Sequence, residues 1–236
     1  MKKQVLVSLL VLLLSAPVVK GQAALLVLIF GDKAATENFH FSLKLGVNYS
    51  IIHGYDEGKN GVGLNFGLVN NIRLTDRLSL IPEFIPVASR KITDVPVLTT
   101  GNPELDDLLV EVESASRKLN YIDIPVLLKV KLNDRVSISA GPQISFLTGA
   151  EDTYSSTPLE GVVLTTQLDI KSAIKAVDAG AVIDLEYIIV HPKGGKGVNL
   201  FLRYNKGFVN LTKEPGEKKI TTSLIQVGAT FPFVHQ

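Results

Sequence analysis

Hydrophobic and polar residues alternate along most of the chain after residue 38. From Phe39 to Ile51 every second residue is apolar or aromatic, and the residues between them are polar or small. The alternation recurs at 62–68, 77–91, 122–132, 136–146, 177–187, 198–205 and 225–233, most weakly at 77–91. Since successive side chains of a strand point to opposite faces, the pattern predicts eight strands, each with one apolar and one polar face.

The connections between these strands alternate in length. Two similar three-residue turns, at 75–77 and 133–135, join the second strand to the third and the fourth to the fifth, so that the apolar residues on either side can pair. About 25 residues separate the third strand from the fourth, and about 20 separate the fifth from the sixth. Short turns at one end, long loops at the other and an even strand number are typical of outer-membrane barrels. We therefore predict an all-β fold, an eight-stranded antiparallel up-and-down transmembrane β-barrel over residues 39–236, with both termini in the periplasm.

Four prolines fall inside the predicted strands: Pro82, Pro86, Pro125 and Pro142. Proline cannot donate a ladder hydrogen bond, and a closed sheet has no free edge that would tolerate the missing donor. We therefore expect a bulge or a strand end near each proline.

The polar face of the strands carries charges of both signs. They are Lys44, Arg73, Glu83, Asp123, Lys129, Asp184, Glu186 and Arg203. In a membrane barrel these residues would face a narrow lumen that side chains fill, so we predict a lumen ion-pair network rather than an open pore. Aromatic residues near the strand ends, and the many Gly, Ser and Asn residues on the polar face, favour this interpretation. The alternative is a soluble periplasmic lipocalin-like barrel that binds an apolar ligand inside and exposes the same charges to water.

The first 21 residues have the pattern of a secretory signal peptide. Lys2 and Lys3 precede an apolar run at 5–19, and the small residue Gly21 ends the segment. Residues 22–38 form an N-terminal segment with an apolar run at 23–30 that is too short to span a bilayer. We expect this run to form either a short helix on the membrane surface or a plug at the barrel mouth.

Composition narrows the chemistry further. The chain has no Cys, which excludes disulfides, Zn–thiolate sites and Cys nucleophiles. Without the three lysines of the signal peptide it carries 21 basic and 23 acidic residues, a balance that does not favour nucleic-acid binding. His53 and Ser50 are the nearest approach to a catalytic pair, and we interpret their proximity as a coincidence of sequence. We expect no catalytic residues, no metal site, no cofactor and no enzymatic activity.

The predicted loop from Ile92 to Ser116 is acidic and contains no basic residue. Its carboxylates are Asp94, Glu104, Asp106, Asp107, Glu111 and Glu113. These groups could bind divalent cations that bridge lipopolysaccharide, dock a basic partner, or be solvated without a partner. Within the loop, residues 103–112 could form a short helix capped by Asn102.

Several short motifs stand out along the chain. The most specific is Tyr121-Ile122-Asp123-Ile124-Pro125, followed by Ala140-Gly141-Pro142-Gln143; the others are Gly46-Val47-Asn48, the segment 63–67 and the segment 80–83. These motifs resemble those of the PorT-like outer-membrane β-barrel family of Gram-negative bacteria. The resemblance covers nearly all of the chain from residue 39 onward. It implies an eight-stranded barrel related in shape to OmpA and OmpX, with prolines tolerated at 125 and 142. It implies no single activity, although the founding member is linked to protein secretion.

These observations predict an integral outer-membrane β-barrel that is structural or an accessory in envelope or secretion processes. Its long outer loops would be the interaction surface. The expected partners are outer-membrane lipid, lipopolysaccharide and other envelope proteins, with no nucleic acid. We expect ion conductance through the lumen to be small or absent.

Overall fold

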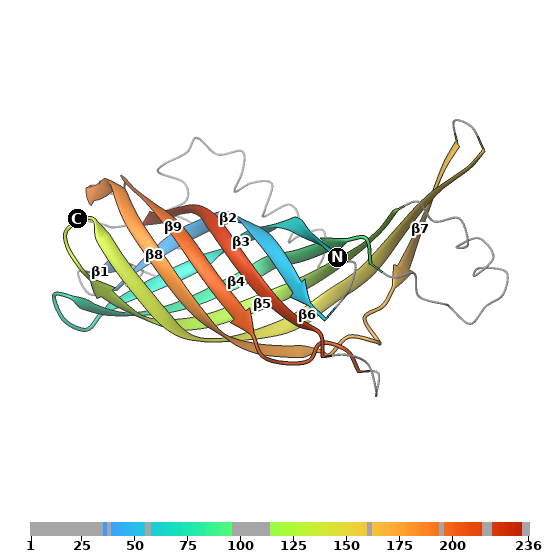
Figure 1. The fold of residues 1–236 in the computed structure, drawn as a ribbon. Coiled ribbons are helices and arrows are strands. Elements are labelled where there is room, and N and C mark those ends of the chain that lie inside the picture. The colour runs from blue at the N-terminus through green and yellow to red at the C-terminus, as the bar shows by residue number, and fades with distance from the viewer. Residues whose placement is uncertain are drawn as a thin grey trace, which may run out of the picture.

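The chain forms a closed antiparallel β-barrel in the computed structural model (Figure 1). The structure describes residues 35–36, 39–54, 58–95, 114–159, 162–193, 196–213 and 219–232. Eight strands make the barrel: β2 (Phe39–His53), β3 (Lys59–Arg73), β4 (Leu78–Thr93), β5 (Ser114–Lys131), β6 (Val136–Leu159), β8 (Val177–Lys193), β9 (Lys196–Gly207) and β10 (Thr221–Pro232). Each strand pairs with its neighbours, and β10 closes the barrel on β2 over the register Thr221↔His53 to Pro232↔Ser42. The predicted fold class is confirmed.

Two further strands lie outside the closed barrel. The two-residue β1 (Ala35–Thr36) pairs with the first residues of β2. Strand β7 (Val162–Asp169) pairs only with β6. Within the predicted N-terminal segment 22–38, the structure describes only this short strand. The predicted signal peptide, 1–21, lies outside the described residues.

The short turns gather at one end of the barrel, which we call the turn end, and the longer connections at the other, which we call the loop end. The pairing expected across the two similar turns is confirmed: the Leu74 amide donates to the Leu78 carbonyl at 2.9 Å, and the Leu132 amide to the Val136 carbonyl at 2.9 Å. In both turns the side chain at the first position caps the returning strand, because Thr75 Oγ1 accepts from the Leu78 amide and Asn133 Oδ1 from the Val136 amide.

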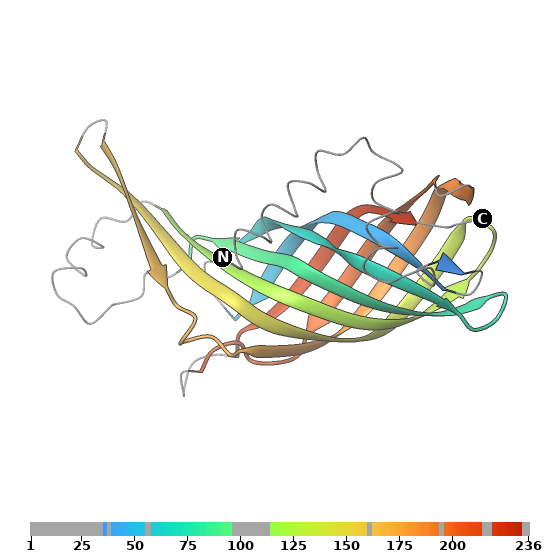
Figure 2. The same cartoon turned by 180° about the vertical axis from the view of Figure 1, so that it is seen from behind.

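The connection between the fifth and sixth predicted strands is not a simple loop. Strand β6 continues to Leu159 and turns back as β7, so the two form an arm that projects beyond the barrel at the loop end (Figures 1 and 2). The base of the arm is supported on its other side by the first residues of β5, where Ser114 pairs with Ser155 and Leu119 with Ala150. The expectation of a loop after residue 146 was wrong because β5 itself begins earlier than its apolar alternation indicates and offers β6 a partner.

The prolines behave differently from one another. Near Pro86 the register of β4 shifts by one residue against both neighbouring strands. The shift falls between Ile85 and Ala88 in the pairing with β5, and opposite residues 66–68 in the pairing with β3. This irregularity is the expected bulge. The registers of Pro82, Pro125 and Pro142 continue without a shift, with Pro142 opposite Ala181. The expectation of a bulge or a strand end was wrong at these three positions, because the strand pairs continue in the same register on both sides of each proline.

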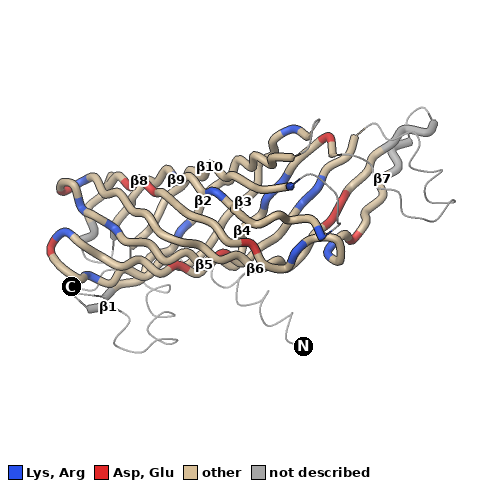
Figure 3. The backbone as a smooth tube through the Cα atoms, turned by 60° about the horizontal axis from the view of Figure 1, so that its bottom comes forward, with Lys and Arg blue, Asp and Glu red and all other residues tan. Residues whose placement is uncertain are grey.

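The apolar rows face outward and the charged rows face inward. Leu64, Ile183 and Leu202 are 51–63% exposed, whereas Lys44, Asp123 and Arg203 are 1–3% exposed. Charged residues occur along the strands themselves as well as at the barrel ends (Figure 3). A soluble barrel would show the opposite orientation, so the lipocalin-like alternative is wrong. Separately, none of the described residues forms a helix of the length and hydrophobicity that a membrane span requires.

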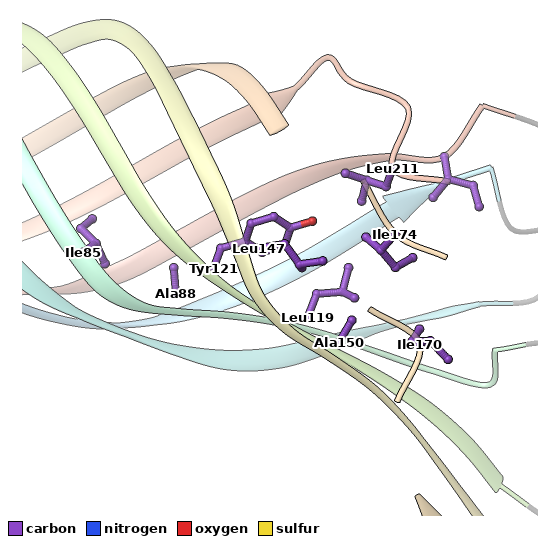
Figure 4. Close-up of a cluster of buried hydrophobic side chains, with 10 residues drawn as sticks. Ile85, Ala88, Leu119, Tyr121, Leu147, Ala150, Ile170, Ile174 and Leu211 are labelled. Carbon is purple, nitrogen blue, oxygen red and sulfur yellow. The ribbon is translucent and has the colours of Figure 1, made fainter. Parts of the chain in front are cut away.

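An apolar cluster closes the lumen at the loop end (Figure 4). It consists of Ile85, Ala88, Leu119, Tyr121, Leu147, Ala150, Ile170, Ile174, Leu211 and Ile220. Two loop segments bring the last four of these over the mouth, where the Lys175 amide donates to the Leu211 carbonyl at 2.7 Å and the Leu211 amide to the Ile220 carbonyl at 2.9 Å. Backbone pairing between the loops thus holds apolar side chains as a lid.

Candidate functional site

The barrel interior contains a charge-balanced cluster made by four different strands. Lys44 of β2, Glu83 of β4, Asp184 of β8 and Arg203 of β9 form it, and all four are nearly fully buried. Arg203 donates two parallel hydrogen bonds to Glu83, from Nη1 to Oε2 at 2.7 Å and from Nη2 to Oε1 at 2.6 Å. Its Nε donates to Asp184 Oδ2 at 2.7 Å. We call this group the central cluster.

Lys44 completes the central cluster from β2, which lies two strands away from both β4 and β9. Its Nζ donates to Glu83 Oε1 at 3.3 Å and to Asp184 Oδ2 at 3.1 Å. The Phe201 ring lies 4.1 Å from the same nitrogen, as a cation–π partner. Two cations and two carboxylates therefore neutralise one another, and the bidentate guanidinium geometry is the strongest that such a pair offers.

Glycines make room for this arrangement. Gly46 of β2 lies directly opposite Gly228 of β10. A Cβ at Gly46 would lie 2.9 Å from the Phe201 ring, and one at Gly228 would lie 2.8 Å from it. The two glycines thus leave the volume that the aromatic ring occupies beside Lys44.

A second buried cluster lies nearer the loop end. Arg90 of β4 donates to Asp178 Oδ2 at 2.9 Å and to Asp123 Oδ1 at 3.1 Å. It also donates to Ser145 Oγ and Thr222 Oγ1, and its guanidinium lies 4.0 Å from the centre of the Tyr121 ring. One guanidinium thus joins β4, β5, β6, β8 and β10, and the cluster contains one carboxyl more than it has bases.

Ion pairs continue toward both ends of the interior. At the loop end Arg117 holds Asp152 through two hydrogen bonds of 2.7 Å, and Tyr154 donates to the same carboxylate at 3.0 Å. At the turn end Lys129 pairs with Glu186. A cavity of about 120 Å³ lies there, and its lining includes both of these residues, His40 and parts of the central cluster. The cavity therefore ends on the central cluster.

Most of the residues predicted for the lumen network come together, with one exception. Lys44, Glu83, Asp123, Lys129, Asp184, Glu186 and Arg203 are each in an interior ion pair. Arg73 is not: it ends β3, its side chain is 47% exposed, and it pairs with Asp76 in the adjoining turn. Placing Arg73 in the lumen was wrong because Arg73 is the last residue of β3, at the turn end, where its side chain reaches solvent and the turn residue Asp76.

Sequence reasoning did not select Arg90, Arg117, Asp152 or Asp178. Arg90 follows the bulge at Pro86. Before the bulge the odd-numbered residues of β4 face inward, and after it the even-numbered residues do, so the bulge places Arg90 on the inward face. Asp178 stands on the polar side of its alternating segment, so the sequence contained that signal. Arg117 and Asp152 lie where strands extend beyond the apolar alternation.

The predicted acidic loop is described only at its start. Asp94 has a left-handed backbone, with φ of 55°, and pairs with Lys59 Nζ at 2.7 Å. Glu104, Asp106, Asp107, Glu111, Glu113 and the predicted helix at 103–112 lie outside the described residues. Over the described ranges, no group of three or more His, Asp or Glu side chains is arranged to hold a metal ion.

The pair His53 and Ser50 is not assembled. Ser50 is buried in the interior, where its Oγ accepts from the Lys91 amide at 3.3 Å. His53 points outward, and its Nε2 lies 3.0 Å from Ser223 Oγ. Ser223 is only 1% exposed, so this hydroxyl is covered and not presented to a substrate.

Comparison with known proteins agrees with this architecture. The sequence model of a family described as "Outer membrane protein beta-barrel domain" matches residues 30–213. A search of curated proteins found no match.

Solved structures of similar fold include Ail, Neisserial surface protein A and the outer membrane protein OprG. The Ail protein of Yersinia pestis is 13% identical, with 84% of this chain and 100% of that chain covered and a TM-score of 0.40. Neisserial surface protein A is 11% identical, with 84% and 100% covered and a TM-score of 0.43. OprG of Pseudomonas aeruginosa is 12% identical, with 85% and 98% covered and a TM-score of 0.40.

Proposed function

The chain belongs to the family of outer membrane protein β-barrel domains, and from this premise we propose that it is a non-conducting, non-enzymatic barrel that acts as a structural or accessory component of the envelope. The barrel would anchor the protein in the outer membrane, and the elements at the loop end would be its interaction surface.

The observation that carries this proposal is the closed lumen. The central cluster joins β2, β4, β8 and β9 across the interior, and the Arg90 cluster lies between it and the loop end. Beyond them the apolar lid closes the mouth, with Leu119 and Leu211 each 1% exposed. An eight-stranded barrel is just wide enough for side chains to fill, and these ion-paired and apolar layers in series among the described residues support a lumen without an open aqueous path.

The loop end supports a role in contacts outside the membrane. The β6–β7 arm extends the sheet beyond the barrel, and Thr165, Gln167 and Asp169 of β7 are exposed. One edge of β7 pairs with β6, and its other edge has no neighbouring strand among the described residues. A strand edge of this kind is a surface to which another polypeptide can pair. Other envelope proteins and lipopolysaccharide are the partners we propose for this end.

Several finer assignments are part of the proposal. We place the chain among PorT-like barrels on its Tyr121–Pro125 and Ala140–Gln143 motifs, with a signal peptide at 1–21 and both termini in the periplasm. The turn end would then face the periplasm and the loop end the cell exterior, as in barrels with short periplasmic turns. Enzymatic function is disfavoured by the separation of Ser50 from His53 and by the covered Ser223 hydroxyl.

Planar-bilayer recording of the purified full chain tests the closed lumen. We expect no stepwise conductance from the wild type. A variant with Ile174→Gly and Leu211→Gly, which thins the lid but leaves both ion clusters in place, should also remain closed, because the clusters still block the lumen. Regular, protein-dependent conductance steps from the wild type would contradict the proposal.

Site-specific photo-crosslinking in cells tests the interaction surface. A photoreactive residue at Gln167 of β7 is compared with one at Asp76, whose side chain is 91% exposed in a turn at the opposite end. We expect discrete protein adducts at Gln167 that differ from those at Asp76. If Gln167 and neighbouring arm positions yield no adduct while the protein is folded and inserted, the arm does not act as an interaction surface.

A further inference from the structure

A polar patch lies on the outer wall where the apolar rows of β9 and β10 end, beside Ile51 of β2. In register, Lys206 of β9 stands opposite Ser223 of β10, which stands opposite Ile51 of β2. The row below it, toward the turn end, is Tyr204, Ile225 and Tyr49, all of them 38–44% exposed. On β9 and β10 the change from a lipid-facing row to polar side chains therefore takes place within two residues, about 7 Å along the strands.

Three polar side chains converge on the covered hydroxyl of Ser223. Lys206 Nζ donates to Ser223 Oγ at 3.1 Å, and the Tyr204 hydroxyl lies 3.4 Å from it. His53 Nε2 lies 3.0 Å away. We call Lys206, Ser223, His53 and Tyr204 the edge patch.

The hydrogen-bond capacity of the edge patch is only partly used. A hydroxyl oxygen that accepts from Lys206 and Tyr204 can give its own proton to His53 Nε2. The neutral imidazole then keeps an Nδ1–H donor, and the ammonium, with three donors, keeps two. Among the described residues no carboxylate pairs with Lys206 or His53. The patch therefore presents a cation and a second donor with no anion of its own.

The far wall of the barrel does not repeat this arrangement. Strand β5 lies opposite β10 in the closed sheet, and its apolar rows end at Asn120 and Lys118. Lys118 is exposed, pairs in register with Lys91 and Glu151, and makes no hydrogen bond or ion pair with another described side chain. An exposed lysine on the opposite wall, also beyond the apolar rows, is therefore available as a control for unspecific charge.

We propose that the edge patch binds a phosphate group of a membrane lipid headgroup, with the lipid chain lying on the Tyr204–Ile225–Tyr49 row. The headgroup phosphates of a bilayer lie at the depth where a lipid-facing apolar surface gives way to polar groups. Lys206 reaches this depth with its stem along the apolar wall and its ammonium at the polar edge. The phosphate would accept from the Lys206 ammonium and from His53, and Ser223 would hold both donors in place. That the leaflet is the outer one rests on the proposed orientation of the barrel; the binding itself does not.

Titration of the reconstituted full chain tests the proposal. Diphosphoryl lipid A is added to the protein in phosphatidylcholine nanodiscs, and retained lipid is counted by native mass spectrometry for the wild type, Lys206→Gln and Lys118→Gln. We expect Lys206→Gln to weaken lipid A retention about tenfold, the loss of one charge-assisted hydrogen bond, and Lys118→Gln to change it less than twofold. The double variant Lys206→Gln with His53→Gln should lose specific retention altogether. Heat-modifiable gel mobility verifies that each variant is folded.

Three results would overturn the proposal. Equal losses for Lys206→Gln and Lys118→Gln would mean general surface charge. Retention unchanged by the double variant would mean that the patch is not the site. Inorganic phosphate that displaces lipid A at equal concentration would mean an anion site with no contribution from the apolar row. None of these results depends on conductance or on crosslinking of the arm, so failure here leaves the proposed function standing.

Discussion

Removing Arg203 should destabilise the barrel more than any surface change, because the central cluster depends on it. Its guanidinium makes two hydrogen bonds to Glu83 and also binds Asp184, and the side chain is 1% exposed. In Arg203→Met both carboxylates would face Lys44 alone, which leaves one buried negative charge without a partner. Breaking a buried pair on one side costs about 3–5 kcal/mol. Since Lys44 stays in place and the neighbouring cavity can admit water, we expect about 3 kcal/mol.

A double variant separates charge balance from lost packing. Glu83→Gln combined with Arg203→Met leaves Lys44 and Asp184 as one balanced pair. If the cost of Arg203→Met arises from an unpaired carboxylate, the double variant should be more stable than the sum of the single changes by about 2 kcal/mol, within the range of contacting residues. Arg73→Met is the matched control, because its side chain is 47% exposed and an exposed pair contributes about 0–1 kcal/mol.

The assay is urea unfolding in phosphatidylcholine vesicles. The chain contains no Trp and six Tyr residues, so tyrosine fluorescence and heat-modifiable gel mobility follow the transition. Two outcomes would refute the reasoning: an Arg203→Met midpoint that matches that of Arg73→Met, or single-variant effects that add without coupling.

Three further predictions concern packing, pH and lipid contact. Gly228→Val should cost about 3 kcal/mol or more, because a Cβ at this position would lie 2.0 Å from the Leu45 carbonyl oxygen and 2.8 Å from the Phe201 ring; the same unfolding assay measures this loss. The hydrogen bond from Lys131 and the charge of that residue lower the pKa of Asp134, in the turn after β5. The small stabilising effect of the Asp134 carboxylate should therefore be complete above the unfolded-state pKa and be lost as pH falls through the lower folded-state pKa. An NMR titration of the wild type, compared with Asp134→Asn, measures this loss. Leu185→Arg, at a 44% exposed position near the middle of β8, should cost about 2–4 kcal/mol in vesicles, whereas a change of under 0.5 kcal/mol would mean that the residue does not face lipid.

The sequence was sufficient for the strand number and for which face holds the charges. Period-two alternation is a local property, and each alternating segment became one strand of the barrel. Which face points to lipid and which to the lumen followed from the charged residues on one face, because a lipid-facing wall does not tolerate charges. Sequence reasoning failed where strand pairing extends beyond the long apolar alternation. Strand β7 and the loop-end parts of β5 and β6 are rich in Ser, Thr and charged residues, have only short apolar rows such as Leu164 and Leu168, and are held by their ladder. Polar strands of that kind look like loops to any argument from hydrophobicity.

The interior partners could not be predicted for a different reason. Alternation tells which side of a strand a residue takes, but not its height along the barrel axis relative to residues on other strands. The bulge at Pro86 changed that height and side for Arg90, and so decided that Arg90 meets Asp123 and Asp178. The outward pairing of His53 with Ser223 likewise depends on the closing register of β10 with β2, which no local pattern contains.

The sequence separations within the central cluster suggest why a membrane barrel retains buried charges at all. Lys44 and Asp184 are 140 residues apart and lie on strands that are not neighbours, with β9 and β10 between them. Their hydrogen bond can form only when β10 has closed on β2 in the correct register. A slip of one residue would turn Lys44 toward lipid, where a charge at mid-bilayer costs about 2–4 kcal/mol, and would leave the two carboxylates under-compensated inside. The central cluster therefore stabilises the closed barrel specifically over misregistered alternatives, and this selectivity, more than its net contribution to stability, is the physical advantage of charges in the interior.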